Sequence, residues 1–291
     1  MTAPHGTENT AAIAGGGRAG GRFPLFRLAL LRRRRMLAAL LLGMAVFETL
    51  IVVIANTVPP ETLFAAGGRQ PPRALRAFSG TSGDVAVASY PGLLGGGLTH
   101  PFWIALQLTA IGSLAAAAVA ADVESGTMEL LMVRPLSRAR LLAERTAALI
   151  VVSVLLNVVA TLTVAAGVAL SPRLHDTVPL GGVFAAGLLG WGFALCVTGP
   201  ALAVSAAGRR RARVVGTTIA FGAVGFAVNF VALAWSRAAP LRWISPFHYY
   251  TPGDALALGT VEWESFGVLA GVGVLGIALA FALLARRDLA P

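Results

Sequence analysis

Long apolar stretches separated by shorter polar ones run through most of the sequence. Six of these stretches hold about 20 residues with few charges, which is the length an α-helix needs to cross the roughly 30 Å hydrocarbon core of a bilayer. The pattern therefore predicts an all-α polytopic membrane protein with six transmembrane helices. The expected spans lie near residues 36–58, 101–121, 146–170, 180–207, 214–235 and 265–285.

The N-terminal residues differ from the rest of the chain. Residues 1–22 are rich in Gly, Ala, Thr and Arg and have no apolar periodicity, which predicts a disordered cytoplasmic tail. Residues 23–35 combine a leucine-rich run with four consecutive arginines, a composition typical of an interfacial helix that leads into the membrane. Residues 36–291 are expected to form a single transmembrane domain.

The arginines indicate which segments face the cytoplasm. Seventeen of the 23 basic residues lie in residues 1–35, 122–145, 208–213 and the C-terminus, and six lie in the other connections. Under the positive-inside rule both termini are cytoplasmic, and the protein is a multi-pass component of the cell membrane. Because most arginines flank apolar spans and lack interleaved aromatics, we expect the lipid bilayer, and no nucleic acid, as their partner.

The composition excludes several kinds of chemistry. All 23 basic residues are arginine, and a chain without lysine can form neither a Walker A nucleotide site nor a Schiff base. The four histidines are scattered without an i,i+4 pair, and the single cysteine, Cys196, lies in an apolar run, so neither a metal site nor an intrachain disulfide is expected. We expect this chain to bind no cofactor itself.

Polar side chains inside the spans are candidates for a substrate pathway or a gate. Glu48 lies about midway along the first span, where a charge costs about 2.5–3.5 kcal/mol on insertion scales. The alternative is a protonated or hydrogen-bonded packing group, and the sequence does not separate the two roles. Gln107, Asn157 and Asn229 are further candidates, although hydrogen bonding between helices explains such residues more often than substrate contact.

Residues 122–144 are the most polar interruption, with four carboxylates and three arginines between two apolar runs. Met128, Leu131 and Met132 recur at i, i+3 and i+4, which predicts a short amphipathic helix. Pro135 ends this helix, and Ser137 can cap the one that follows. Apolar residues framed by charge indicate a docking surface for a soluble partner.

Residues 59–100 and 236–264 form the two longer outer segments. The second of these segments precedes the last span and is rich in aromatic residues. The later segment carries Trp243, Phe247, Tyr249, Tyr250 and Trp263. Their amphipathic rings suit the headgroup level of the membrane, either as an aromatic belt or as part of a re-entrant turn.

Both features resemble ABC-2 type permeases, and the resemblance covers roughly residues 25–287. The first matching motif is Glu124-Ser-Gly-Thr-Met-Glu-Leu-Leu-Met-Val-Arg-Pro-Leu-Ser-Arg-Ala-Arg-Leu-Leu, and the second is Ser245-Pro-Phe-His-Tyr-Tyr-Thr-Pro-Gly-Asp-Ala-Leu256. One departure is the lack of lysine after the first motif, where relatives often place a basic residue, and Arg145 is expected to substitute for it.

The resemblance implies the transmembrane subunit of an ATP-driven exporter, in which two permeases, identical or related, work with two separate ABC ATP-binding subunits. ATP and Mg²⁺ belong to those partner subunits. Residues 122–144 are then a coupling helix, continuous with spans two and three, that sits in a cleft of the ATPase. The residues expected to carry this coupling are Glu124, Gly126, Thr127, Glu129, Leu130, Leu131, Arg134, Pro135, Ser137 and Arg138.

The resemblance also implies an outer re-entrant element that helps to close the exit. Its expected residues are Ser245, Pro246, Phe247, Tyr249 and Tyr250. Because the spans consist mostly of Ala, Leu, Val and Gly, we expect an apolar or amphipathic cargo.

Three other classes of protein fit the sequence less well. A proton-coupled secondary transporter could use Glu48 and would need no ATPase. An intramembrane serine protease could use Ser113 or Ser153, but the histidines near the spans fall at or outside their predicted outer ends. A structural membrane scaffold is the third alternative.

Overall fold

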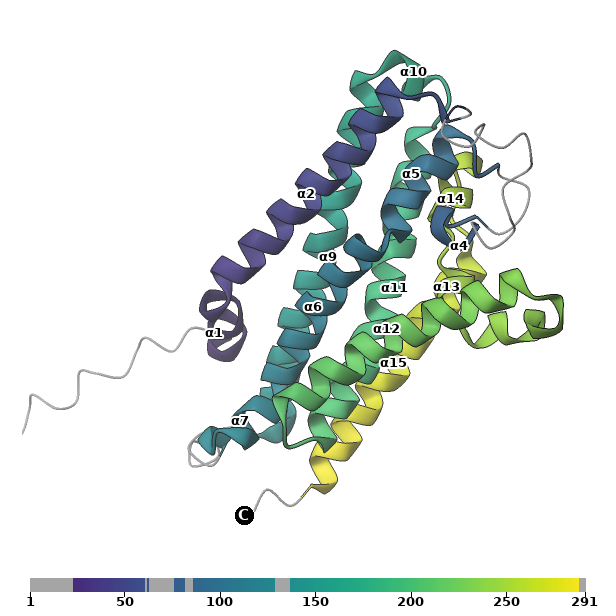
Figure 1. The fold of residues 1–291 in the computed structure, drawn as a ribbon. Helices are drawn as coiled ribbons and strands as arrows, with labels where there is room; N and C mark the ends of the chain where they lie inside the picture. The colour runs from purple at the N-terminus through teal and green to yellow at the C-terminus, as the bar shows by residue number, and fades with distance from the viewer. Residues whose placement is uncertain (1–22, 61, 63–75, 82–85, 129–136, 288–291) are drawn as a thin grey trace, which may run out of the picture.

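Six helical segments of membrane-spanning length lie in the described part of the chain, as the hydrophobic pattern predicts (Figure 1). The computed structural model describes residues 23–60, 62, 76–81, 86–128 and 137–287, and every regular element in these ranges is a helix. The predicted tail, residues 1–22, lies outside the described residues. The helices of membrane-spanning length are α2 (Arg34–Thr57), α5 with α6 (Tyr90–Thr99 and Pro101–Ala118), α9 (Arg138–Leu170), α11 (Leu180–Ala207), α12 (Arg211–Ala234) and α15 (Trp263–Arg286).

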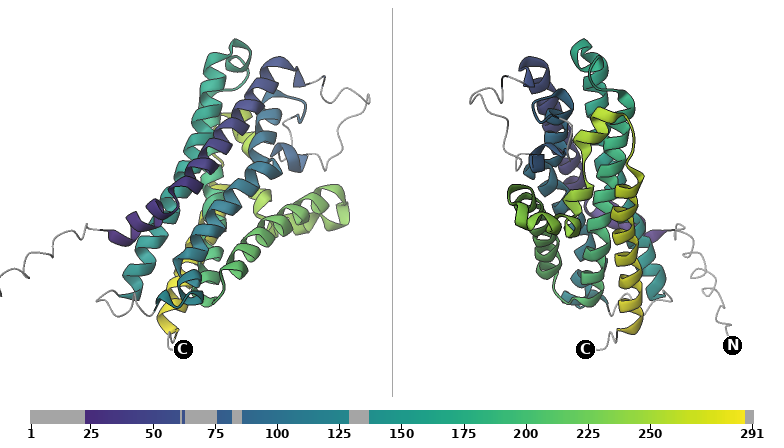
Figure 2. Two further views of the ribbon diagram at one scale, coloured as in Figure 1. Left: turned by 60° about the vertical axis from the view of Figure 1, so that its left-hand side comes forward. Right: turned by 90° about the vertical axis from the view of Figure 1, so that its right-hand side faces the viewer.

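Short helices lie at the ends of these spans or between them. At one end of the bundle, together with the C-terminal end of α15, lie α1 (Pro24–Arg32) and α7 (Ala120–Glu124), whereas α10 (Pro172–His175) lies at the other end (Figures 1 and 2). The remaining short elements are α4 (Arg76–Ser79), the 3-10 helix η3 (Ser236–Ile244), α13 (Pro246–Tyr249) and α14 (Pro252–Leu258).

The centre of the bundle is α11, which packs against α6, α9, α12, α14 and α15. It approaches α15 most closely where glycines face each other, because a Cβ at Gly276 would overlap the backbone of Gly199. Without a hydrophobic driving force inside a membrane, small residues permit the close van der Waals packing that holds helices together. These glycines therefore fix α15 against the central helix.

The second span starts earlier than predicted. Residues 59–100 were expected to form an outer segment, but residues 90–99 belong to α5, which meets α6 at His100 and Pro101. A Cβ at Gly95 would lie 2.6 Å from the Cα of Gly253 in α14. The glycines at this point allow close helix contact instead of marking a turn.

Candidate functional site

The polar stretch 122–144 begins with a short helix and a sharp turn. α7 ends at Glu124, and Gly126 follows with a φ of +70°, a left-handed conformation that suits glycine. Residues 129–136 are not among the described residues. Of the predicted coupling residues, Glu129, Leu130, Leu131, Arg134 and Pro135 therefore lie outside the description.

The other end of the stretch is the start of the longest helix. α9 begins at Arg138, and the Ser137 hydroxyl caps it by accepting a hydrogen bond from the amide of Arg140 at 3.2 Å. The helix continues for 33 residues, or about 50 Å at 1.5 Å per residue. One element therefore joins the polar stretch to the far end of the third span.

The predicted continuity with the second span is wrong. Val119, with φ −145° and ψ −54°, separates α6 from α7. At the end of α6 the carbonyls of Ala117 and Ala118 accept hydrogen bonds from the Arg145 guanidinium at 3.1 and 2.6 Å. This guanidinium satisfies acceptors that a helix end leaves without intrahelical partners, so the helix can stop without a glycine or proline.

Asp122 and Arg145 connect α7 to α9. Their side chains form an ion pair of 2.5 Å and are 16% and 12% exposed. The Thr127 hydroxyl donates to the carboxylate of Asp122 at 3.2 Å. Because Arg145 also binds the end of α6, one guanidinium holds three helices in register.

Glu144 connects α9 to the N-terminal helix. One of its carboxylate oxygens accepts hydrogen bonds from the amides of Leu25 and Phe26, at 2.9 and 3.2 Å, while the other lies 3.0 Å from Arg140 Nε. Glu144 is only 4% exposed. The first amides of a helix lack intrahelical acceptors and favour negative charge, so this carboxylate caps α1.

Glu124 connects the stretch to α12, and Arg138 connects it to Arg287, which follows α15 and binds α11. The Glu124 carboxylate accepts a hydrogen bond from the amide of Arg211, the first residue of α12, at 2.7 Å. Arg138 donates to the carbonyl of Arg287 at 2.6 Å, and Arg287 donates to Ala206 of α11 at 2.7 Å. Burial, and then the nearby Arg209, lowers the pKa of Arg287.

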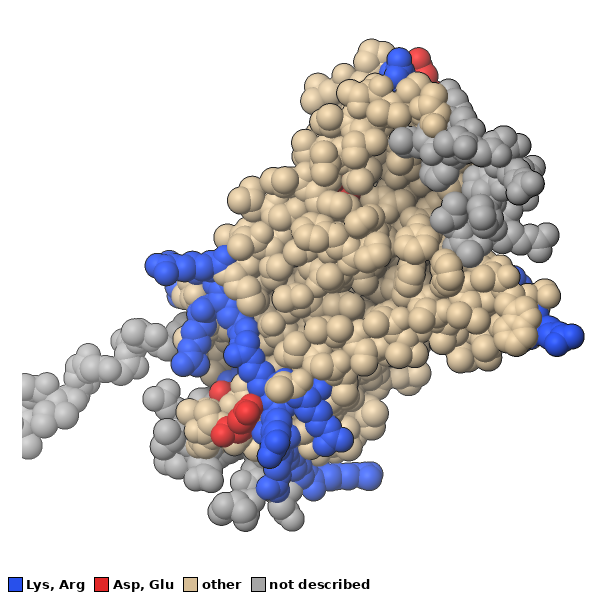
Figure 3. Space-filling model, in the orientation of Figure 1, with Lys and Arg blue, Asp and Glu red and all other residues tan. Residues whose placement is uncertain are grey.

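The described parts of the stretch thus contact α1, α12 and Arg287, and the adjacent Arg145 contacts the end of α6. Figure 3 shows basic side chains gathered around this end of the molecule, with few elsewhere on the visible face. Sequence analysis did not identify Glu144 or Arg145 as site residues. Apart from Arg140, which lies four positions before Glu144, their partners lie more than 20 positions away along the chain. Only the Pro24 that starts a helix indicates that α1 needs a cap.

All four polar residues expected in the substrate pathway are buried. The structure brings together Gln107 and Asn157, whose side-chain amides meet at 3.5 Å between α6 and α9. Glu48 is fully buried beside Gly97, and within the described ranges neither of its carboxyl oxygens has a hydrogen-bond partner. Asn229 lies apart on α12, where no hydrogen bond within those ranges links it to the other three.

The segment before the last span folds back into the bundle. Ser245 donates its hydroxyl to the carbonyl of Gly225 in α12 at 2.7 Å, and the buried Tyr250 donates to Leu98 at the end of α5 at 2.9 Å. The Tyr250 ring stacks on Phe193 of α11 with centroids 4.9 Å apart. Pro246 and Phe247 are buried as well, so α13 and α14 link α5, α11 and α12.

Other aromatic residues of this segment lie at the surface. Trp243 and Trp263 are exposed, whereas the half-buried Tyr249 donates its hydroxyl to the carbonyl of Trp243 at 3.1 Å. The ring of His248 lies edge-on to Trp243. Burial, followed by Arg242, lowers the pKa of His248.

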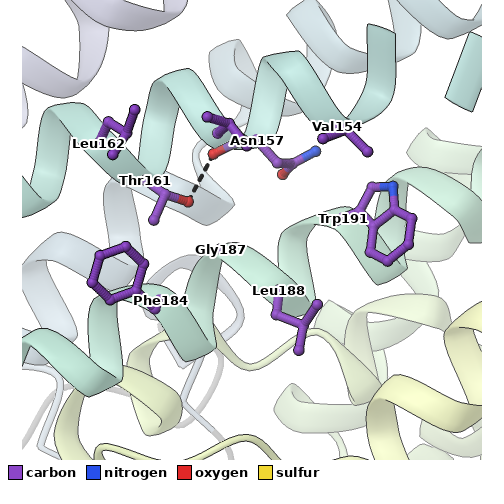
Figure 4. A pocket seen from close by; sticks show the side chains of 9 residues that line it. Val154, Asn157, Thr161, Leu162, Phe184, Gly187, Leu188 and Trp191 are labelled. Carbon is purple, nitrogen blue, oxygen red and sulfur yellow. Dashed lines mark hydrogen bonds between the residues drawn. The ribbon is translucent and has the colours of Figure 1, made fainter. Parts of the chain in front are cut away.

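A cavity of about 430 Å³ lies between α9 and α11 (Figure 4). Its lining is apolar except for Asn157, Thr161 and the indole nitrogen of Trp191, and the Thr161 hydroxyl donates to the carbonyl of Asn157 at 2.7 Å. A second cavity of about 770 Å³, between α2 and α9, includes Asn56 and Thr163 in its lining. Both cavities suit molecules that are mainly apolar.

A family model described as ABC-2 family transporter protein matches residues 30–289. The curated proteins include no match to this chain. The family match spans nearly the whole chain, and the fold supplies six helices of membrane-spanning length. The chain therefore belongs to the ABC-2 transporter family and is a multi-pass membrane permease.

Proposed function

We propose that this permease couples ATP hydrolysis on separate ABC ATP-binding subunits to the export of an apolar or amphipathic compound across the cell membrane. The observation that carries the proposal is the set of contacts made by the described ends of residues 122–144. Glu144, Glu124 and Arg138 reach α1, α12 and Arg287 at the end of α15, and the adjacent Arg145 and Arg287 extend these contacts to α6 and α11. A displacement of the stretch is therefore transmitted to most of the bundle.

The partners in this proposal are two ATP-binding subunits and a second permease, which is either a copy of this chain or a relative. ABC-2 permeases in general work with ABC ATP-binding subunits, and ATP and Mg²⁺ belong to those subunits. The coupling residues are those of the first motif, which offers carboxylates, arginines and an apolar run to a cleft of the ATPase. The arginine-rich end of the bundle then faces the cytoplasm.

ATP can shift the transporter only if its two conformations make different contacts with the ATPase. In our proposal, closure of the ATPases pushes on the stretch, and α9 carries the movement across the membrane. Glu144 makes α1 follow α9, and Glu124 makes α12 follow α7. The hydrogen bond from Tyr250 to Leu98 then belongs to the outer closure of the exit, which α13 and α14 provide.

The substrate pathway in this proposal runs beside α9, where both cavities lie. Apolar walls suit the body of an amphipathic molecule, and Asn157, which lines the first cavity beside Gln107, offers hydrogen bonds to its polar group. Glu48 is a gating residue in this scheme, because its carboxyl lies beside Gly97 at the α2–α5 interface.

A second candidate function is a proton-coupled secondary transporter. The observation in its favour is Glu48 itself, a fully buried carboxyl without a hydrogen-bond partner in the described part of the chain. Intramembrane carboxyls of this kind occur in the proton relays of transporters.

The two functions differ in their energy source. We would purify the full chain in mild detergent, identify co-purifying proteins by mass spectrometry, and measure efflux of a fluorescent lipid amine from proteoliposomes containing the complex. The ABC proposal predicts a co-purifying ATPase and efflux that needs ATP but no proton gradient. Efflux driven by a proton gradient alone, without an ATPase, would contradict it and support the secondary transporter.

A further inference from the structure

A small cleft lies where α1, α6 and α9 meet, at the arginine-rich end of the bundle. It has a volume of about 120 Å³, and we call it the arginine cleft. Apolar side chains form one part of its lining and charged side chains the other. The lining residues used below are Leu25, Leu28, Ala29, Arg32, Arg33, Asp122 and Arg145.

The charges in the arginine cleft do not balance. Three arginines and one aspartate line it, so its net charge is about +2. Asp122 is already paired with Arg145. Within the described residues, Arg32 and Arg33 have no carboxylate within ion-pair distance.

The nearest carboxylates are engaged elsewhere. Glu144 accepts hydrogen bonds from the amides of α1 and pairs with Arg140, and Glu124 accepts from the amide of Arg211. Arg33 is half-buried, and its desolvation, with Arg211 and then Arg32 as like-charged neighbours, lowers its pKa. Burying a guanidinium among other guanidinium groups is unfavourable unless an anion neutralises it.

The place of the cleft indicates what this anion is. Arg33 lies at the junction between α1 and α2, the first span, where a chain enters the membrane at the level of the headgroups. Arginine binds phosphate oxygens in a bidentate manner, and basic pockets between helices on the cytoplasmic side bind acidic headgroups. Leu25 and Leu28 supply apolar surface beside the charges.

We propose that the arginine cleft binds the phosphate of an anionic membrane lipid through Arg32 and Arg33. The acyl chains of this lipid extend along the apolar side of the cleft into the bilayer. The bound phosphate replaces the missing counter-ion and holds the α1–α2 junction against α6 and α9.

The chain offers a matched control for this proposal. Arg33→Gln and Arg35→Gln remove the same charge from neighbouring positions, but Arg35 is exposed and does not line the cleft. Ala29→Phe keeps every charge and fills the cleft, which tests the same site without altering the positive-inside signal.

We would titrate the purified full-length variants with phosphatidylglycerol or phosphatidylcholine and measure bound lipid by native mass spectrometry. Arg33→Gln should weaken phosphatidylglycerol binding by about tenfold or more, the effect of one lost charge-assisted hydrogen bond. Ala29→Phe should also weaken it, while Arg35→Gln should change it less than twofold and no variant should alter phosphatidylcholine binding. Helicity by circular dichroism would establish that each variant is folded, and Ala29→Phe decides the outcome if Arg33→Gln does not fold.

Equal binding by all variants, or an equal loss in Arg35→Gln, would overturn the proposal, because binding would then depend only on the general charge of this end. Inorganic phosphate provides a second arm of the experiment. If millimolar phosphate displaces phosphatidylglycerol as well as a short-chain phosphatidylglycerol does, the cleft takes free phosphate and the lipid assignment is wrong. Displacement by the short-chain lipid alone would support it.

Discussion

Replacing Glu144 should release α1 from α9. The amides of Leu25 and Phe26 have no intrahelical acceptors, and both donate to this buried carboxylate. A buried amide without a partner costs about 1–3 kcal/mol, so Glu144→Ala should weaken the docking of α1 by about 2–4 kcal/mol. Glu144→Gln keeps an acceptor oxygen and loses only the charge, which should cost about 1 kcal/mol.

Hydrogen exchange at the two amides measures this docking directly. Each 1.4 kcal/mol changes the equilibrium constant for undocking of α1 tenfold, so Glu144→Ala should accelerate hydrogen exchange at the amides of Leu25 and Phe26 by about 30- to 700-fold. Mass spectrometry with residue-level fragmentation on protein in nanodiscs can resolve such a change. Glu264→Ala, which removes an exposed carboxylate from the first turn of α15, is the control. Unchanged exchange in Glu144→Ala would show that the carboxylate does not hold α1.

Three further predictions concern other parts of the molecule. Gly95→Val should lower the free energy of unfolding by more than about 2 kcal/mol in thermal denaturation, because its side chain meets the backbone of Gly253, whereas Gly267→Val has open space around it and should be neutral. Burial and a neighbouring arginine lower the pKa of His248 below its ordinary value of 6.5, so the unfolded chain binds the proton more readily. Stability should therefore fall as the pH drops below about 6.5, and His248→Gln should reduce this dependence in melting curves recorded at several pH values. Glu48→Gln should lower efflux more than it lowers the amount of protein in the membrane, and efflux equal to that of the wild type would return Glu48 to a packing role.

The six spans could be predicted because twenty-residue apolar runs have few alternatives in a chain of this composition. Their ends were harder to predict. The predicted third span began near residue 146, whereas α9 begins at Arg138. Hydropathy assigns Arg138, Arg140 and Glu144 to a loop, but Leu141 and Leu142 beside them are buried and Ser137 caps the helix.

The glycines of α5 show a second limit of sequence reasoning. A run of three glycines is a common turn signal, and the same residues also allow helices to approach closely. Which role applies depends on the helices that pack against the glycines. Here these helices are α4, which precedes α5 in the sequence, and α14, which follows it by about 150 residues.

The contacts that join the stretch to other helices could not be predicted, because they link distant segments of the chain. Glu144 lies 119 positions from Leu25, and Arg138 lies 149 positions from Arg287. The motif identified the stretch as important, but it did not show that these charged residues bind other helices of the same chain.

The central claim is that the stretch around Gly126 transmits ATP-driven movement to the membrane helices. Gly126→Pro tests it most directly, since proline cannot adopt the φ of +70° found there. The measurement is the ATP hydrolysis rate of the co-purified complex in proteoliposomes, with and without the lipid amine, for the wild type, Gly126→Pro, Glu129→Arg and the control Glu264→Arg. We predict that substrate-stimulated hydrolysis and efflux are lost in Gly126→Pro and Glu129→Arg while the permease still inserts, and that Glu264→Arg keeps both. Stimulation and efflux at wild-type levels in both stretch variants would contradict the claim.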